Sequence, residues 1–258
     1  MKRYLSLISE LAITGFKLKY NGSFFGYLWS LANPLMYFLV LYFVFTRVFD
    51  LGDSIKNYPL YLLLGVTIWG FFAEATSVCM NSIVSNGDLI RKVYFPRIVL
   101  PIASSLSTFI NLMLNLVVVF AFALVLHVDL TTKIMFIPLY LIEIYFFTLG
   151  VSLFLAALFV KFRDIGPIWG VAMQVLFYAT PIIYPITLVP DRYLKLMMVS
   201  PLAQIIQGFR YSLMSNDIGT SSGTLGIFAF LPVFITLAVF LLGYFSFQKM
   251  AAKFAENV

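Results

Sequence analysis

Few side chains in this sequence belong to the types that carry out covalent chemistry or hold a metal ion. Cys79 is the single cysteine and His127 the single histidine, and they fall in different segments of the chain. A Cys/His metal site or a cysteine–histidine nucleophile pair needs such groups together. The G-x-x-x-x-G-K-[ST] phosphate loop is missing as well, and the sequence has no Gly-Lys dipeptide. We therefore predict no catalytic residue, no metal site and no cofactor bound by this chain.

Two glutamates, Glu74 and Glu143, interrupt long apolar runs of the sequence. A carboxylate inside a membrane is costly, and by default it faces a partner group or a water-filled cavity. Proton coupling is one use for such a group, but no relay of Asp, Glu and His along one face accompanies either residue. We favour polar contacts between helices, or a water-lined substrate path, for both glutamates.

The apolar composition sets the kind of element that must position these side chains. Of the 258 residues, 62% are hydrophobic and 11% are charged, and the mean hydropathy is +0.97. Soluble domains are about half apolar and about a quarter charged, so the excess must face lipid or other buried helices. The sequence predicts an all-α integral membrane protein.

Six apolar runs are long enough for a helix of roughly 20 residues, which crosses a bilayer core about 30 Å thick. They cover residues 28–49, 58–83, 98–126, 134–160, 165–186 and 225–247. The runs are continuous rather than alternating, which argues against a barrel. Most of the 17 lysine and arginine residues lie in segments that are cytoplasmic if the N-terminus is cytoplasmic, as the positive-inside rule prefers. Both termini are then cytoplasmic, and the net charge of +6 requires no nucleic-acid partner.

The segment 1–20 precedes the first run and is amphipathic at helical spacing. Apolar residues that include Tyr4, Leu11 and Phe16 fall in one half of a helical wheel, and Lys17 and most other polar residues fall in the other. Such a helix suits the membrane interface. It either anchors the N-terminus or lines a cytoplasmic entrance and moves as a gate.

The segment 187–224, between the fifth and sixth runs, is too polar for a clean span and too apolar for a free loop. A continuous helix is disfavoured by Pro181 and Pro185, just before this segment, and by Pro190 near its start. Residues 200–214, in contrast, have the pattern of a short helix. Irregular backbone at membrane depth persists only inside protein or beside water. We expect a re-entrant pair of short helices on the outer side, and a surface loop on the head groups is the alternative.

Tyrosine is plentiful inside or near the predicted spans, and a phenol in hydrocarbon must find a hydrogen-bond partner. Aromatic faces also pack against the C–H faces of sugar rings while the hydroxyl exchanges hydrogen bonds. Packing and interfacial positions explain many of these residues. The remaining candidates for a substrate path are Tyr37, Tyr42, Tyr178 and Tyr184, together with Glu74 and Glu143.

The stretch "NGDLIRKVYFPR", residues 86–97, concentrates charge in a chain that is otherwise poor in it. Its first three residues have the pattern of a turn and helix cap, and Pro96 limits the helix. Apolar and charged side chains alternate irregularly between these points. From the residues alone it is either a solvated basic turn of the positive-inside type or a short helix that contacts a cytoplasmic partner.

Four motifs in order resemble the membrane subunit of ATP-binding-cassette exporters for polysaccharides and polyol phosphates. They are "KLKYNGSFFGYLWSLANPLMYFLVLYFVF" at 17–45, "NGDLIRKVYFPRIVLP" from residue 86, "KFRDIGPIWGVAMQVLFYATPIIYP" from residue 161 and "SPLAQIIQGFR" from residue 200. Ser200 stands where the family usually has Asn before the Pro. The resemblance covers nearly the whole chain.

The resemblance implies a six-span permease that acts as a homodimer with two copies of a cytoplasmic ATPase, which bind the ATP and Mg. It implies export of a lipid-linked glycan of the O-antigen type across the inner membrane. Residues 86–97 would be the coupling helix. Its contacts to the ATPase would come from Asp88, Leu89, Ile90, Arg91, Lys92, Tyr94, Phe95 and Pro96.

Other classes fit the sequence less well. A membrane-embedded transferase needs a cluster of acids, His or Arg at one interface, and none is visible. A secondary carrier needs internal repeats or paired broken helices, and only one broken region occurs. Exporters of teichoic acid, of capsule, or of a small lipid or drug stay open as alternatives.

Overall fold

A computed structural model of the chain describes residues 2–20, 26, 28–49, 57–93, 95–128, 132–214, 220–252 and 254. The described residues form helices and turns and no strand. The α-helices are α1 (Lys2–Tyr20), α2 (Leu28–Arg47), α3 (Tyr58–Asn81), α4 (Gly87–Lys92), α5 (Val99–Val125), α6 (Ile137–Lys161), α7 (Ile165–Ala179), α8 (Asp191–Val199), α9 (Pro201–Leu213), α10 (Ser221–Leu225) and α11 (Leu231–Ala251). Short 3-10 helices cover Val84–Asn86, Thr132–Phe136, Ile186–Leu188 and Gly226–Phe230.

Five helical stretches are long and apolar enough to cross a membrane. They are Leu28–Arg47, Tyr58–Asn81, Val99–Val125, Thr132–Lys161 and Gly223–Ala251. The prediction of an all-helical, multi-pass membrane protein is therefore confirmed. These stretches correspond to five of the six apolar runs.

The remaining apolar run, 165–186, is helical only as far as Ala179, so α7 has 15 residues. Thr180 has extended backbone angles. Pro181 and Pro185 follow, and each lacks the N–H that a continuing helix would need. The helix is thus shorter than the apolar run that predicted it, for a reason visible in the sequence.

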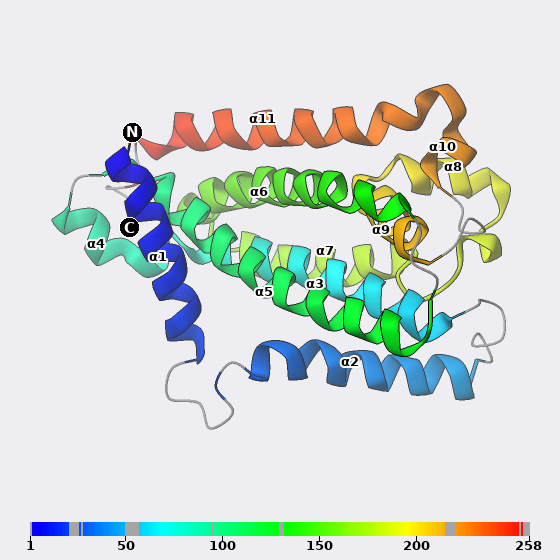
Figure 1. The fold of residues 1–258 in the computed structure, drawn as a ribbon. Helices are drawn as coiled ribbons and strands as arrows, with labels where there is room; N and C mark the ends of the chain where they lie inside the picture. The colour runs from blue at the N-terminus through cyan, green and yellow to red at the C-terminus, as the bar shows by residue number, and fades with distance from the viewer. Residues whose placement is uncertain are drawn as a thin grey trace.

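The long helices run side by side, and α1 lies across them at one end (Figure 1). Helix α4, the start of α1 and the end of α11 share that end, which we call the α4 end. Helices α8, α9 and α10 lie at the opposite end, which we call the α9 end (Figure 1). Helix α3 is central, since 72% of its apolar window is buried, against 11% for α2 and for α11.

Small residues allow the closest helix crossing, between α6 and α11. A Cβ atom added to Gly243 would collide with the backbone of Gly150, and one added to Gly150 would lie 2.7 Å from the backbone nitrogen of Phe240. Close approach of this kind lets membrane helices gain van der Waals contact where no hydrophobic effect drives them together. Helix α1 crosses α5 in a looser contact, in which a Cβ on Gly15 would lie 3.7 Å from Ser107 Oγ.

Candidate functional site

A pocket of about 660 Å³ opens between the end of α1 and helices α2, α3 and α5. Its polar lining comes from Lys19, Ser30, Asn33, Thr67, Glu74, Thr108, Asn111 and Asn115, and its aromatic lining from Trp29, Tyr37, Trp69 and Phe71. Two helices supply most of the polar groups. Both helices belong to apolar runs of the sequence, where polar side chains would otherwise have no use. A polar cavity at this position is a site where a hydrophilic molecule or water meets the bundle.

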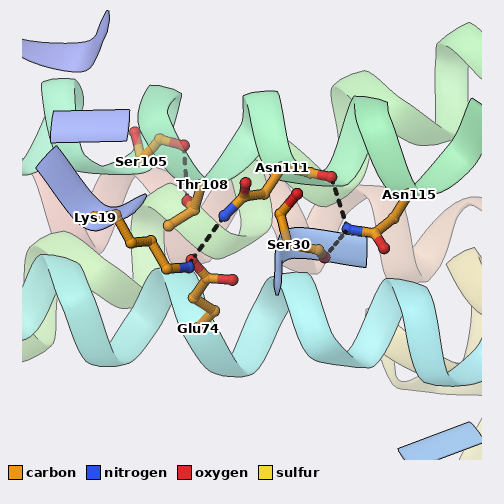
Figure 2. Close-up of polar contacts among 7 residues, drawn as sticks. All are labelled: Lys19, Ser30, Glu74, Ser105, Thr108, Asn111 and Asn115. Atoms are coloured by element: carbon orange, nitrogen blue, oxygen red, sulfur yellow. Dashed lines mark hydrogen bonds and ion pairs between the residues drawn. The ribbon is translucent and has the colours of Figure 1, made fainter. Parts of the chain in front are cut away.

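Glu74 is the centre of the polar contacts in this pocket (Figure 2). Lys19 Nζ lies 2.5 Å from Glu74 Oε1, and Asn111 Nδ2 donates to the same oxygen at 3.1 Å. The side chains of Lys19 and Glu74 are 43% and 31% exposed, so the ion pair faces the pocket rather than the core. Glu74 lies about two helical turns from the α4 end of α3, and Lys19 reaches it from the end of α1.

A polar stripe on α5 forms the facing wall. Asn115 Nδ2 donates to the carbonyl of Ser30 on α2 at 3.2 Å and to the carbonyl of Asn111 at 2.8 Å (Figure 2). Thr108 and Ser105 continue the stripe, and Ser105 Oγ lies 3.1 Å from the hydroxyl of Tyr145. Sequence analysis missed this stripe. The spacing of three and four residues between polar side chains inside the third apolar run was the available signal.

Aromatic rings enclose the pocket on the side of α2 and α7. Tyr37 on α2 is 45% exposed and lies 6.2 Å, ring centre to ring centre, from Phe177 on α7. Trp69 on α3 lies 5.5 Å from the same ring. Of the residues proposed for a substrate path, Tyr37 and Glu74 therefore line one pocket.

The other proposed path residues lie elsewhere. Tyr42 stacks on Phe38, with ring centres 5.8 Å apart. It also packs against the main core cluster, the larger of two clusters of buried apolar side chains among the described residues. Tyr178 is 69% exposed, and the Tyr184 hydroxyl donates to its carbonyl at 2.9 Å. Glu143 is 7% exposed and lines a different pocket, between α6, α9 and α11. The structure thus does not gather the six residues in one place.

Helix α4 separates the predicted coupling residues into two groups. One group is exposed and consists of Asp88, Arg91, Lys92 and Pro96. The other group is apolar and half-buried, and consists of Leu89, Ile90 and Phe95. These three side chains pack against the second core cluster, the smaller of the two clusters of buried apolar side chains. Tyr94 lies outside the described residues. The side chains that α4 presents outward are therefore mainly charged, with Val93, which is 52% exposed, as an apolar addition.

Residues from other parts of the chain lie beside α4 and connect it to the bundle. Arg163, from the turn between α6 and α7, lines a small pocket of about 220 Å³ together with Asp88 and Arg91. Arg97 donates from Nη1 to the carbonyl of Ala251 and so joins the start of α5 to the end of α11. The α4 end is thus a basic, cross-linked surface built from three separate parts of the chain.

The three residues proposed for the interface helix divide in the same way. Leu11 and Phe16 are half-buried, and Leu11 packs against the second core cluster. Tyr4 is 44% exposed. Leu11 and Phe16 are thus more buried than Tyr4.

Arg210 lies on α9, within the short helix that the sequence predicts over residues 200–214, and its charge is buried. Its side chain is 0% exposed. It donates to the carbonyls of Tyr61 at 3.1 Å, Pro181 at 2.6 Å and Ile182 at 2.6 Å, and its guanidinium lies 3.3 Å from the centre of the Tyr61 ring. Burial lowers the pKa of Arg210 to about 10, so the group stays charged at neutral pH. It therefore satisfies the carbonyls that the irregular segment after α7 leaves without helical partners.

The groups that line the Glu74 pocket are of kinds that bind a polar molecule. Within the part of the chain that the structure describes, no three His, Cys, Asp or Glu side chains come together as a possible metal site. Cys79 is buried, and its Sγ donates a hydrogen bond to the Pro101 carbonyl. The pocket around Glu74 instead offers amides, an ion pair and aromatic faces to a polar molecule.

Known proteins are similar to this chain over nearly its whole length. The chain is 29% identical to the O-antigen export system permease protein RfbA of Klebsiella pneumoniae, over 99% of this chain and 98% of that protein. It is 26% identical to the protein of the same name in Myxococcus xanthus, over 99% and 96%. The polysialic acid transport protein KpsM of Escherichia coli is 21% identical over 83% and 84%. Residues 7–214 match the family described as ABC-2 type transporter, and a match over so much of the chain shows that the protein belongs to this family.

Proposed function

We propose that this chain is the membrane subunit of an ATP-driven exporter that moves a lipid-linked polysaccharide of the O-antigen type across the inner membrane. The observation that carries the proposal is the end-to-end similarity to permease proteins named for O-antigen export. The intramembrane pocket around Glu74 supports it, because amides and aromatic faces suit a sugar-containing molecule. ATP hydrolysis belongs to a separate partner chain, which holds the ATP and Mg.

A capsule-type polysaccharide is the second candidate substrate. Its support is the similarity to the polysialic acid transport protein, which covers less of the chain at a lower identity than the O-antigen permeases do. An export assay with each class of glycan distinguishes the two candidates.

In this proposal α7 is a sixth crossing. The start of α1 and the end of α11 share the α4 end (Figure 1), which requires an even number of crossings. Five helical stretches are long enough, and α7 leads from the α4 end toward α8 and α9 at the opposite end. The α4 end is cytoplasmic and α9 is a re-entrant helix near the outer side, since the α4 end holds more Lys and Arg.

Labelling of single cysteines tests this topology. With Cys79 replaced by Ala, a cysteine at Ser6 or Ser85 is expected to resist a membrane-impermeant thiol reagent in intact cells. A cysteine at Lys195 on α8 is expected to react, because that side chain is exposed at the α9 end. Labelling of Ser6→Cys from outside would overturn the orientation and the position of the ATPase.

The ATPase contacts the α4 end in this proposal, and two copies of the chain meet two ATPase chains. The exposed charges Asp88, Arg91 and Lys92 make the outer contacts, while Leu89 and Phe95 fix α4 on its own bundle. Arg91→Gln is therefore expected to weaken co-purification of the ATPase, with the largest difference from wild type at low salt, because salt screens contacts between exposed charges. Phe95→Ala acts first on the placement of α4.

Export is the direct test of the whole proposal. Cells that lack this gene are expected to accumulate lipid-linked glycan inside the inner membrane, and the wild-type chain together with its ATPase is expected to restore surface glycan. An ATPase variant that cannot hydrolyse ATP is the matched control and should not restore it. Normal surface glycan in cells without the chain would overturn the proposal.

A further inference from the structure

A second pocket, of about 670 Å³, lies between α6, α9 and α11, away from the Glu74 pocket. Its walls are mostly apolar, and they come from Leu139, Ile142, Phe146, Ala229, Phe230, Val233, Phe234, Leu237 and Phe240. Most of these side chains are exposed on the α6–α11 face, for example Ile142 at 56% and Phe234 at 66%. In a membrane protein such a face meets lipid chains, so the pocket opens toward the bilayer.

Buried polar groups lie inside this apolar frame, where α6 meets α9. Glu143, Gln204 and Thr236 are 7%, 7% and 5% exposed. Glu143 Oε1, Gln204 Oε1 and Thr236 Oγ1 have no hydrogen-bond partner in the structure. A buried polar atom without a partner is costly. Gln204 Oε1 is an acceptor, and Glu143 Oε1 is one when the carboxylate is ionised, so a hydrogen-bond donor would satisfy both atoms.

The charges around the pocket select the kind of donor. Among the described residues that line it, Glu143 is acidic and none is Lys or Arg. An acidic group and no basic side chain in the described lining suit a hydrogen-bond donor that carries a positive charge.

We propose that this pocket binds a membrane phospholipid with a primary ammonium head group, such as phosphatidylethanolamine. The ammonium donates to Glu143 and Gln204, and the acyl chains run along Ile142 and Phe234. The site is separate from the proposed glycan path, and its occupancy by lipid stabilises the packing of α9 against α6 and α11.

Lipid retention by the purified chain tests the assignment. The full chain is placed in nanodiscs of equal parts phosphatidylethanolamine, phosphatidylcholine and phosphatidylglycerol, and lipids that stay bound are counted by native mass spectrometry. Phosphatidylethanolamine is expected to be enriched over phosphatidylcholine, which has no donor, and over phosphatidylglycerol, which is anionic. Glu143→Gln is expected to reduce the enrichment by about tenfold, since one charge-assisted hydrogen bond is worth about that factor.

Two substitutions on one helix separate the pocket from general lipid contact. Val233 lines the pocket and Leu242 does not, and both are exposed apolar residues of α11. Val233→Trp is expected to abolish the enrichment, whereas Leu242→Trp is expected to leave it unchanged. Equal retention of the three lipids, or identical behaviour of the two Trp variants, would overturn the site. Preference for phosphatidylglycerol would overturn the ammonium assignment. None of these outcomes depends on glycan export.

Discussion

Arg210 and Glu74 are both charged groups inside an apolar bundle, but their surroundings differ in kind. Arg210 is fully buried, and three backbone carbonyls and a tyrosine ring surround its guanidinium. Glu74 is partly exposed to a pocket and shares one oxygen between Lys19 and Asn111. The surroundings of Arg210 leave no space for a ligand, whereas Glu74 borders a pocket that has such space.

The difference leads us to expect different roles for the two charges. Arg210 joins α3, α9 and the irregular segment after α7, so its loss would leave buried carbonyls without donors. Glu74 and Lys19 join α1 to the wall of the pocket, so their loss would change a contact that water already screens. We therefore expect stability to depend mainly on Arg210, and export mainly on Glu74.

Replacing Arg210 is expected to have the largest effect. Arg210→Leu should lower the free energy of unfolding by more than about 3 kcal/mol, because removing one partner of a buried charged network leaves the others unsatisfied. The thermal midpoint of the purified protein in detergent measures this. Arg192→Gln on exposed α8 is the control, with an expected change within about 0.5 kcal/mol. Equal midpoints for the two variants would remove the structural role of Arg210.

Gly65 tests the same network from the side of α3. A Cβ at this position would lie 2.5 Å from Arg210 Nη2 and 2.9 Å from the Ile182 carbonyl. Gly65→Ala should therefore cost about 1–3 kcal/mol by overpacking. Gly70→Ala, on the same helix and with open space around it, should be neutral or slightly stabilising. A neutral Gly65→Ala would show that Arg210 can move without cost.

The ion pair of the Glu74 pocket should behave in the opposite way. Glu74→Gln and Lys19→Gln are each expected to slow export severalfold while lowering stability by less than about 1 kcal/mol. The double variant should export about as well as the single ones, because the two side chains act through one contact. Export rate and thermal midpoint, measured on the same four proteins, decide this. Additive losses of export would show that the two residues act separately.

Tyr37 and Tyr42 provide the finest comparison, with two tyrosines on one helix. Tyr37 lines the pocket, whereas Tyr42 packs against the core. Tyr37→Leu is expected to slow export with little change in stability. Tyr42→Leu is expected to cost about 1 kcal/mol of stability, as for a lost aromatic pair, and to leave the export rate per folded protein unchanged. Normal export by Tyr37→Leu would return that residue to lipid packing.

Much of the fold could be predicted because length and composition constrain membrane helices strongly. An apolar run of about 20 residues has few stable structures in a bilayer other than a helix, so α2, α3, α5, α6 and α11 follow from hydropathy. Pro181 and Pro185 indicated the break after α7. The amphipathic pattern of 1–20 likewise indicated α1.

The side chains that meet in the site could not be predicted in the same way. Glu74 and Glu143 are alike in sequence, since each is one acid in an apolar run, and they were given the same two alternatives. The structure places Glu74 beside Lys19 and Asn111, and Glu143 beside Gln204 in a lipid-facing pocket. The coupling residues show the same limit, because periodicity over six helical residues does not tell which face rests on the bundle.

By itself the sequence determined that the chain forms helices across a membrane and which family its motifs resemble. These properties depend on local chemistry: hydropathy, proline, charge clusters and spacing. Only the tertiary structure decided that Arg210 is a buried support, that the polar stripe on α5 faces Glu74, and that Glu143 has an unpartnered oxygen. These properties depend on which helices are neighbours, and neighbours are set by close packing at residues such as Gly65 and Gly243, far from the groups that they bring together.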